Sequence, residues 1–396
     1  MAENYAHSVQ QVAAKGATLH TFSSPQRDKL QQLLPSLQAH YQQPLVLMSR
    51  QILARQVARF QAALPTIAPH FAVKANPHPD VLRCLMEAGT GFEVASKAEL
   101  DQLLAMGVQA SKVFYSNPVK SPHYIAYAAS MGVEWFALDS VEELEKIHRI
   151  APAAKLYLRI YTSNKGSSIE LSAKFGASRE DVSAVIARAA ALGADLAGVT
   201  FHVGSQCCNV DNWRLGIERS AEIFGEMHRA GLEPRLLDLG GGYPVSIDQA
   251  APSLELIAQV IHSALQPLLV EFGNITVIAE PGRFLVAEAG LFVCQVVAAS
   301  RRDQQNWLYL DAGFYGGLLE IKEGLEYPIT TLASGPEQSW VLAGPTCDSI
   351  DICSDQYRLP ASLQAGDWVM VGCAGAYSNA CACEFNGFPL PKVVME

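Results

Sequence analysis

The sequence predicts an α/β protein in which a (β/α)8 barrel, or TIM barrel, is followed by a smaller β-sandwich or β-barrel unit. Eight short β-rich runs alternate with helical stretches between residues 70 and 280, a rhythm typical of a parallel sheet. Chemically reactive residues recur near the C-terminal ends of these runs, where the active sites of such barrels form. After residue 283 the rhythm changes to strands joined by turns. A doubly wound open sheet is the alternative for the first part, and the count of eight favours the barrel.

The eight expected barrel strands are short and rich in apolar residues. They are His70–Lys74, Gly91–Ala95, Lys112–Ser116, Trp135–Asp139, Lys155–Tyr161, Gly198–His202, Arg235–Leu239 and Thr276–Glu280. Helical stretches separate consecutive strands. They are Pro79–Ala88, Lys97–Met106, Pro122–Ser130, Val141–Arg149, Arg179–Leu192, Trp213–Ala230 and Leu254–Glu271.

The second part of the chain has little helical pattern. Its expected strands are Leu291–Ala298, Trp307–Asp311, Gln338–Ala343 and Asp367–Val371. Short strands joined by turns suit a β-sandwich or a small barrel. The chain therefore divides into residues 1–44, 45–283 and 284–396. The first segment could add a strand or helix to the β unit, the second forms the barrel, and the third forms the β unit.

Composition and charge exclude several classes of function. With 29 basic against 39 acidic residues, the net charge of −10 argues against affinity for nucleic acid or an anionic membrane. No apolar run approaches the ~20 residues that span a bilayer, and the first residues lack the apolar stretch of a signal peptide. The nine cysteines form no CxxC pair and no cluster with metal-ligand spacing, so we expect no metal. These features predict a soluble cytoplasmic protein with reduced thiols.

Lys74 ends the first apolar run and is the first candidate for chemistry. The run Phe71–Val73 leads into this lysine, and Asn76-Pro77 then stops the strand. Burial at a strand end is expected to lower the pKa of the amine. An amine that loses its proton easily can form a Schiff base with a carbonyl group. The alternative is a lysine that extends to the surface from a strand end.

Two segments near late strand ends could bind an anion. Gly240–Gly242 follows the strand that ends at Leu239, and three glycines let several backbone N–H groups converge on a phosphate. A plain tight turn explains the glycines equally well. In the segment Glu280-Pro281-Gly282-Arg283, Glu280 would face the barrel mouth and Arg283 could complete a phosphate cradle. The alternative for this segment is a Glu–Arg ion pair at the boundary between the units.

Two further segments carry candidate site residues. His202 ends the sixth strand, and Ser205 follows it closely with a hydroxyl donor; a structural histidine is the alternative. The loop Gly344–Ser349 holds Cys347 between small and polar residues, as expected for a substrate-facing thiol. Asp348 beside it could pair with a cationic substrate, although a turn with a buried thiol has the same pattern.

These segments together resemble the fold type III pyridoxal-phosphate decarboxylases, the group of ornithine and diaminopimelate decarboxylases. The resemblance runs from about Leu45 to Pro391. Its motifs occur in one order and are Val73–Asn76, Gly91–Ser96, Lys174–Gly176, His202–Ser205, Gly240–Gly242, Glu280–Arg283 and Cys347-Asp348. The last loop and the segment Glu384–Phe388 look most like those of ornithine decarboxylases.

The resemblance implies pyridoxal 5′-phosphate as cofactor and assigns residues to it. Lys74 would hold the cofactor covalently, Glu280 would keep the pyridine nitrogen protonated, and His202 would stack on the ring. Arg159 would lie near the other polar edge of the ring. The phosphate would be bound by Ser205, Gly241, Gly242, Arg283 and Tyr377.

The resemblance also implies the substrate contacts and the assembly. Cys347 would protonate the substrate carbon after carbon dioxide leaves, and Asp348 would pair with the distal amine. Tyr377 and Phe385 would line the substrate site, with Glu323 or Glu320 as a further acid. In this family the Cys-Asp loop reaches the active site of the neighbouring subunit, so a head-to-tail homodimer with shared sites is implied.

The leading hypothesis is therefore decarboxylation of L-ornithine to putrescine. Lysine, meso-diaminopimelate or a modified diamino acid of polyamine or siderophore synthesis are the alternatives. Diaminopimelate decarboxylases usually carry Glu after the cysteine, where this chain has Asp348. Glu93 stands where eukaryotic ornithine decarboxylases usually carry aspartate. A non-catalytic homologue like the antizyme inhibitors is a reading of another class, and the presence of Lys74 and Cys347 argues against it.

Overall fold

The first half of the molecule is a closed parallel barrel. The computed structural model describes residues 24–247 and 250–396. The barrel strands follow the order β10-β11-β2-β3-β4-β5-β6-β8, and all neighbours are parallel. Their bounds are β2 (Ala68–Ala72), β3 (Gly91–Val94), β4 (Val113–Tyr115), β5 (Trp135–Leu138), β6 (Lys155–Arg159), β8 (Asp195–Thr200), β10 (Leu236–Asp238) and β11 (Thr276–Ala279). The predicted (β/α)8 barrel is confirmed, and each of the eight expected strands is present.

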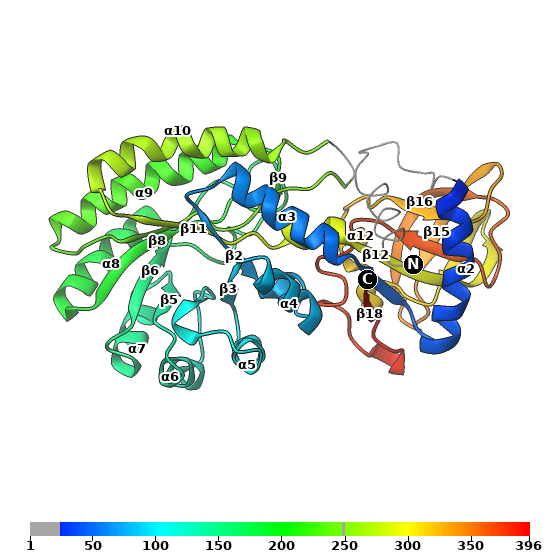
Figure 1. Cartoon of the computed structure of the whole chain (residues 1–396), viewed down its shortest axis with the longest axis horizontal. Helices are drawn as coiled ribbons and strands as arrows, with labels where there is room; N and C mark the ends of the chain where they lie inside the picture. The colour runs from blue at the N-terminus through cyan, green and yellow to red at the C-terminus, as the bar shows by residue number, and fades with distance from the viewer. Residues whose placement is uncertain (1–23, 248–249) are drawn as a thin grey trace.

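The seven helices expected between the strands surround the barrel (Figure 1). They are α4 (Pro79–Glu87), α5 (Lys97–Ala105), α6 (Pro122–Ser130), α7 (Val141–Ile150), α8 (Arg179–Leu192), α9 (Asp211–Arg229) and α10 (Leu254–Phe272). Several begin at a serine whose hydroxyl accepts a backbone N–H of the first turn, as expected of an N-cap. Ser96, Ser140, Ser178 and Ser253 act in this way.

An eighth helix, α3 (Arg50–Ala63), was not predicted. It packs against α4, α10 and β2 and so completes the ring around the barrel. Its buried side chains include Ile52, Leu53, Val57 and Phe60, which share one helix face. The apolar spacing of this helix face is visible in the sequence. Helix α3 lies before the first barrel strand, however, where the strand–helix rhythm gives no reason to expect a helix.

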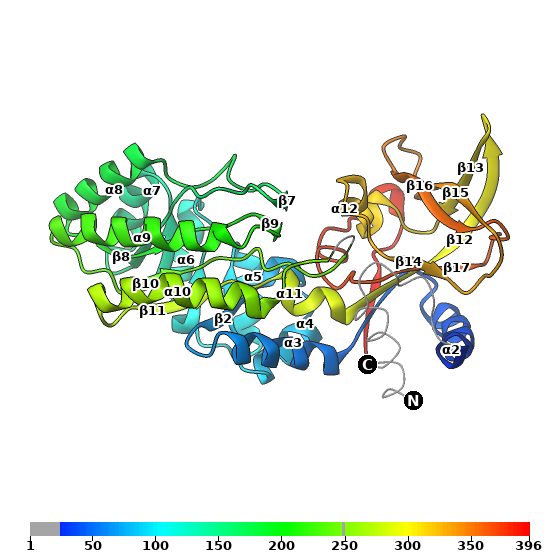
Figure 2. The ribbon, with the colours of Figure 1, turned by 90° about the horizontal axis from the view of Figure 1, so that it is seen from above.

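The second unit is built on one eight-stranded sheet beside the barrel (Figures 1 and 2). Four of its strands were expected: β12 (Gly290–Arg302), β13 (Gln305–Leu310), β15 (Glu337–Ala343) and β17 (Trp368–Val371). The other four were not predicted. They are β1 (Leu45–Met48), β14 (Ile329–Thr331), β16 (Ile352–Pro360) and β18 (Lys392–Met395).

The pairing of strand β1 places the boundary between the two units after residue 48. This strand pairs antiparallel with β12 and parallel with β18, so residues 45–48 belong to the second sheet and not to the barrel. The boundary drawn at residue 45 is therefore misplaced. All four residues of β1 are buried, and a short apolar run of this kind fits a barrel strand equally well. Only the pairing partners, which are distant in sequence, distinguish the two.

The described part of the N-terminal segment lies with the second unit. Helix α2 (Ser24–Tyr41) lies beside the second sheet in both views (Figures 1 and 2). The expectation that the whole of residues 1–44 joins the second unit stays a prediction, because residues 1–23 lie outside the described part of the chain. Among the described residues, no helix is long and apolar enough to cross a membrane.

Candidate active site

The C-terminal ends of the barrel strands enclose a cavity of about 420 Å³. Lys174 and Phe175, from one of the motifs singled out in the sequence, lie on its wall. The strand ends supply most of the polar groups that face it. They are Lys74, Glu93, Ser116, Arg159, His202 and Glu280. Four of the predicted site residues are thus brought together from strands far apart in sequence.

Lys74 lies in a single turn of 3-10 helix, η1 (Val73–Ala75), directly after β2. Its Nζ donates to Oε1 of the buried Glu93 at 3.0 Å. Burial disfavours the ammonium, but Glu93, Tyr377 and Glu280 outweigh this effect and raise the pKa of Lys74 above its usual value. The expectation of a lowered pKa was wrong. Sequence periodicity shows that the strand is buried, but not that carboxylates from other strands surround its end.

Glu280 follows β11 and is held in a network of buried polar groups. Ser116 Oγ donates to Glu280 Oε1 and lies 2.8 Å from the hydroxyl of Tyr157. Burial raises the pKa of Glu280 well above its usual value, and the nearby carboxylates of Asp238 and Glu93 add to the effect. Glu280 is therefore a carboxyl group that favours its protonated form until a positive charge faces it.

Asp238, at the end of β10, is not in the cavity lining but acts on Glu280 through its charge, and it was not predicted. Its carboxylate accepts hydrogen bonds from Thr200 Oγ1 at 2.8 Å and from the Gly240 backbone N–H at 2.9 Å. Burial raises the pKa of Asp238 to about 6 despite these bonds. Ser116 was missed as well. Both residues occupy strand-end positions equivalent to those that were chosen, and that shared position was the available signal.

His202 lines the cavity as a neutral ring. Its Nδ1 accepts a hydrogen bond from the Gly204 backbone N–H at 3.0 Å, so the neutral ring carries its proton on Nε2. Burial lowers the pKa of His202 well below its usual value, and the cationic side chains of Arg159 and Lys74 contribute. The guanidinium of Arg159 lies 5.3 Å from the centre of the Phe175 ring on the same cavity wall.

The glycine triplet lies against this histidine. A Cβ on Gly241 would be 2.9 Å from Nε2 of His202, and a Cβ on Gly242 would be 2.3 Å from the carbonyl oxygen of Gly204. Gly242 also has φ +98°, a conformation that other residues rarely adopt. The backbone can approach the histidine segment this closely only because these residues are glycines.

Arg283 makes an ion pair with an acid from the second unit. Its guanidinium contacts Glu320 through two nitrogens, with Nη2–Oε1 at 2.6 Å and Nη1–Oε2 at 2.9 Å. Nη2 also donates to Ser205 Oγ at 3.2 Å, and Nη1 donates to the Tyr327 hydroxyl at 3.1 Å. The buried Nε has no hydrogen-bond partner among the described residues. A Glu–Arg pair at the unit boundary was an alternative prediction, but the partner is Glu320 and not Glu280.

A segment of the second unit reaches the turn that carries Lys74. The Tyr377 backbone N–H donates to the Ala75 carbonyl at 2.9 Å, and Asn76 Nδ2 donates to the Gly375 carbonyl at 2.8 Å. The ring centre of Tyr377 lies 4.8 Å from Cζ of Arg283. The structure thus places Tyr377 between Lys74 and Arg283, at the junction of the two units.

Three further predicted residues, Cys347, Asp348 and Phe385, lie in a separate cluster with Tyr315 and Asn386, which were not predicted; we call these five residues the Cys347 face. The Tyr315 hydroxyl donates to Asp348 Oδ2 at 2.7 Å, and its ring stacks on Phe385 with centroids 4.4 Å apart. The Cys347 backbone N–H donates to Asn386 Oδ1 at 3.1 Å. The Tyr315 hydrogen bond lowers the pKa of Asp348, which favours the carboxylate.

The Cys347 face and the cavity are distinct sites within one chain. The cavity lining contains none of the five residues of the Cys347 face, within the described part of the chain. The Cys347 side chain is exposed instead. The two acids considered for the substrate site lie in different environments. Glu320 is buried against Arg283, whereas Glu323 is exposed just after α12 (Leu319–Lys322). Glu320 is therefore committed to an internal ion pair.

Comparison with known proteins decides the family. The family described as "Pyridoxal-dependent decarboxylase, pyridoxal binding domain" matches residues 50–287. This chain belongs to the pyridoxal-dependent decarboxylases. It is therefore an amino-acid decarboxylase that uses pyridoxal 5′-phosphate, and the resemblance to the fold type III group is confirmed.

Individual relatives agree with this assignment over most of the chain. An ornithine decarboxylase of Schizosaccharomyces pombe is 36% identical over 354 residues, covering 86% of this chain and 80% of that protein. An antizyme inhibitor 2 of Xenopus laevis is 36% identical over 351 residues, covering 84% and 76%. The solved structure of a lysine/ornithine decarboxylase from Vibrio vulnificus with putrescine has a TM-score of 0.85 and 31% identity, covering 95% of this chain and 99% of that one.

The cavity residues, together with groups that are outside the cavity lining, fit this cofactor. Pyridoxal phosphate needs an amine for attachment, an acid near its ring nitrogen and donors for its phosphate. Lys74 faces the cavity beside the buried carboxyl group of Glu280. The close backbone at Gly241, the Ser205 hydroxyl and the unpaired Nε of Arg283 supply groups suited to an anion.

Proposed function

We propose that the protein decarboxylates a basic L-amino acid and that L-ornithine, which yields putrescine and carbon dioxide, is its preferred substrate. The observation that carries the proposal is the partly buried side chain of Asp348, one residue after the exposed Cys347, in which the hydrogen bond from Tyr315 lowers the pKa and favours the carboxylate. A carboxylate at this position suits a substrate whose distal end is an ammonium group. The likeness to named ornithine decarboxylases supports the same choice.

The barrel cavity would hold the cofactor in a defined orientation. Lys74 would attach it, Glu280 would face the pyridine nitrogen, and His202 would lie against the ring, with Arg159 and Tyr377 at its edges. The phosphate would be received by Ser205, Gly241, Gly242 and Arg283. When bound, the cofactor supplies a sink for the electron pair that is left when carbon dioxide departs.

Side chains of the protein would accept protons and stabilise charge during the reaction. Lys74 can attack a carbonyl only as a neutral amine, and Glu93 at 3.0 Å is placed to accept its proton. Glu280 would hold a positive charge on the ring nitrogen, because a protonated pyridine opposite a carboxylate satisfies both buried groups. His202, kept neutral by burial and by Arg159 and Lys74, adds no further positive charge near the reacting centre.

The Cys347 face would complete the site from a second subunit. Cys347 would donate a proton to the carbon that has lost its carboxylate, and Asp348 would bind the distal ammonium of the substrate. Because the cavity of one chain lacks these residues in its described lining, we propose a homodimer in which each cavity receives the partner's Cys347 face. The exposed thiols of Cys347, Cys381 and Cys383 suit the reducing cytoplasm.

A related substrate is the main competitor. A relative in Selenomonas ruminantium is named lysine/ornithine decarboxylase and is 33% identical, so lysine is the second candidate. Meso-diaminopimelate carries a distal carboxylate that Asp348 would repel. The likeness to an antizyme inhibitor keeps a non-catalytic role as an alternative of another class, which the presence of Lys74 and Cys347 disfavours.

The test is carbon dioxide release from ornithine, lysine, arginine and meso-diaminopimelate, measured with pyridoxal phosphate added. We expect the highest kcat/KM for ornithine. Release that is fastest from another basic amino acid would reassign the substrate within the same chemistry. Release from none of the four by protein that binds the cofactor would overturn the proposed substrate class, and protein that binds no cofactor would support the non-catalytic role.

A further inference from the structure

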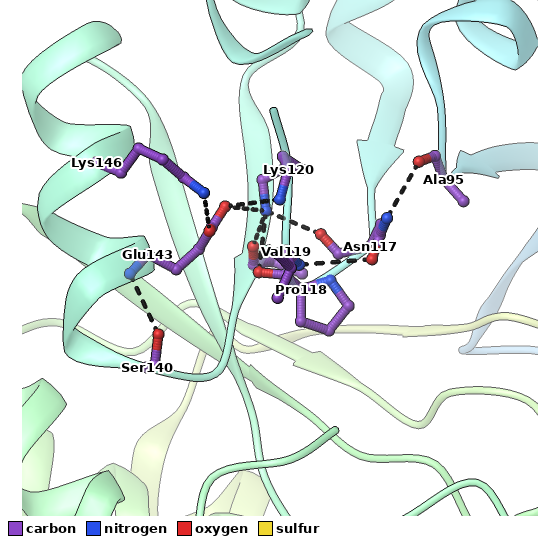
Figure 3. A network of polar contacts seen from close by, with 9 residues as sticks. Ala95, Asn117, Pro118, Val119, Lys120, Ser140, Glu143 and Lys146 are labelled. Carbon is purple, nitrogen blue, oxygen red and sulfur yellow. Dashed lines mark hydrogen bonds and ion pairs between the residues drawn. The ribbon is translucent and has the colours of Figure 1, made fainter. Parts of the chain in front are cut away.

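Behind the cavity wall lies a buried ammonium group to which the proposed mechanism gives no role. Lys120 lies between β4 and α6, and its side chain has no exposed surface. Its Nζ donates to the backbone carbonyl of Asn117 at 2.8 Å, to that of Pro118 at 3.4 Å, and to that of Ala137 in β5 (Figure 3). One side chain therefore connects the loop after β4 to the neighbouring strand.

The charge of Lys120 is balanced by one buried acid on α7. Glu143 Oε1 lies 3.1 Å from Nζ of Lys120 and accepts the backbone N–H of Lys120 at 3.1 Å (Figure 3). The other carboxylate oxygen pairs with Lys146. The backbone of Glu143 lies in the first turn of α7, where its N–H donates to Ser140 Oγ at 3.2 Å. The contacts with Lys120 and Lys146 hold the carboxylate itself in place.

The loop that Lys120 holds forms part of the active-site wall. Asn117 and Pro118 line the cavity, and Ser116 donates to the carboxyl group of Glu280. Asn117 adds a bond of its own to the Ala95 carbonyl at 3.4 Å, which reaches the end of β3 (Figure 3). The loop therefore links three adjacent barrel strands at the level of the cavity.

Stability alone does not account for an ammonium at this position. A buried ion pair is costly to desolvate, and an apolar side chain of similar volume is often as stable or more stable. An ammonium differs from an apolar chain in that it donates several directed hydrogen bonds. Lys120 directs them at two cavity-lining residues, Asn117 and Pro118, and at Ala137.

We infer that Lys120 is a positioning residue of the active site, which holds Ser116, Asn117 and Pro118 in place and, through Ser116, orients the carboxyl group of Glu280. Lys120 does not line the cavity itself, so it acts through the loop. The inference rests on the proposed role of Glu280 at the cofactor ring. It predicts that loss of the ammonium changes cofactor binding and turnover even where the fold is intact.

The experiment compares Lys120→Met with the double variant Lys120→Met/Glu143→Gln, and uses Lys146→Met as the matched control. Lys146 pairs with the same carboxylate but is partly exposed, at 22%, and is not bonded to the loop. The double variant also removes the charge of Glu143, which keeps only Lys146 as its ion-pair partner when Lys120 is lost, so it separates the loss of charge balance from the loss of the carbonyl contacts. Each protein is measured for its urea midpoint, its affinity for pyridoxal phosphate, the pH profile of the bound cofactor's absorbance, and kcat and KM.

We expect the double variant to recover the urea midpoint of the wild type while kcat stays at least ~10-fold low, since small displacements of site groups can cost up to ~100-fold. The absorbance pH profile should shift in both Lys120 variants and not in Lys146→Met. Recovery of kcat and of the absorbance profile together with stability in the double variant would overturn the inference. If wild-type protein binds no cofactor, the proposed function fails; if it binds cofactor and both Lys120 variants match it, only this inference fails.

Discussion

At Lys74, burial and neighbouring charge act on one amine in opposite directions. Burial disfavours the ammonium, whereas the carboxylate of Glu93 at 3.0 Å favours it most, with Tyr377 and Glu280 contributing, and these groups outweigh burial and raise the pKa of Lys74. The amine is therefore held as an ammonium until its proton passes to a neighbour. The hydrogen bond to Glu93 also fixes the direction of the Lys74 side chain, which lines the cavity.

The first prediction concerns attachment of the cofactor. Lys74→Ala should abolish turnover, and borohydride should no longer fix pyridoxal phosphate to the protein, because the reduced bond requires this amine. Lys174→Ala is the matched control, since Lys174 also lines the cavity and its loss should leave the fixed cofactor in place. Peptide mapping after reduction reports the labelled residue. Label on Lys174 or another lysine in the Lys74→Ala protein would show that the attachment site is wrong.

The second prediction concerns substrate choice. Asp348→Asn keeps the shape of the side chain and an acceptor for Tyr315 but removes the charge. A charge-assisted hydrogen bond contributes roughly 1.5–3 kcal/mol, so kcat/KM for ornithine should fall by at least ~10-fold. Cofactor affinity should stay near that of the wild type, since Asp348 lies on the Cys347 face and not in the cavity lining. A variant that loses cofactor but keeps its preference among diamino acids would make Asp348 structural.

At the scale of elements, the barrel follows from sequence more directly than the second sheet. The eight barrel strands alternate with seven helices along the chain, so the rhythm alone locates all eight strands. In the second unit, β1 and β18 come from opposite ends of the described chain and pair with each other. Pairing across that distance leaves no periodic pattern in the sequence, which is why no strand was predicted at residues 45–48 and these residues were included in the barrel range.

Some residues of the candidate site could likewise be predicted from the sequence and others could not. Residues with distinctive chemistry at strand ends, such as Lys74, His202 and Glu280, could be predicted from their position. Ser116 shares that strand-end position, but a serine has no distinctive chemistry until its partner Glu280 is known, so position was the one signal that pointed to it. The Arg283–Glu320 pair could not be predicted, since it joins two units and Glu320 had been considered for a substrate contact.

The third prediction concerns this pair, which ties α11 (Arg283–Val286) to α12. Glu320→Gln leaves the buried guanidinium of Arg283 without its counter-charge, which typically costs roughly 3–5 kcal/mol. Urea unfolding of the cofactor-free protein should show the loss, and added pyridoxal phosphate should restore part of it, because an anion would then face Arg283. Glu337→Gln, which breaks an exposed pair with Arg358 at 3.6 Å, should cause a much smaller change. Destabilisation that the cofactor does not relieve would argue against phosphate binding at Arg283.

At the scale of the whole molecule, the two units divide the chemistry between them. The barrel contains the cavity that Lys74 lines. Tyr377 of the second unit contacts the turn that carries Lys74. The second unit also carries the Cys347 face, whose thiol is exposed in the single chain. A second copy of the chain that covers this face would join the two halves of the site, so the proposed activity belongs to the assembly and not to the isolated subunit.

Subunit mixing tests this central claim most directly. Lys74→Ala and Cys347→Ala subunits should each be inactive alone, because each lacks one half of every site. Random exchange between them should restore about a quarter of the wild-type activity, since roughly half of the dimers are then hybrids with one complete site of two. The measurement is carbon dioxide release from ornithine after exchange is verified by mass. Recovered activity at that level is the predicted result, and no recovery in verified hybrids would contradict a site shared between subunits.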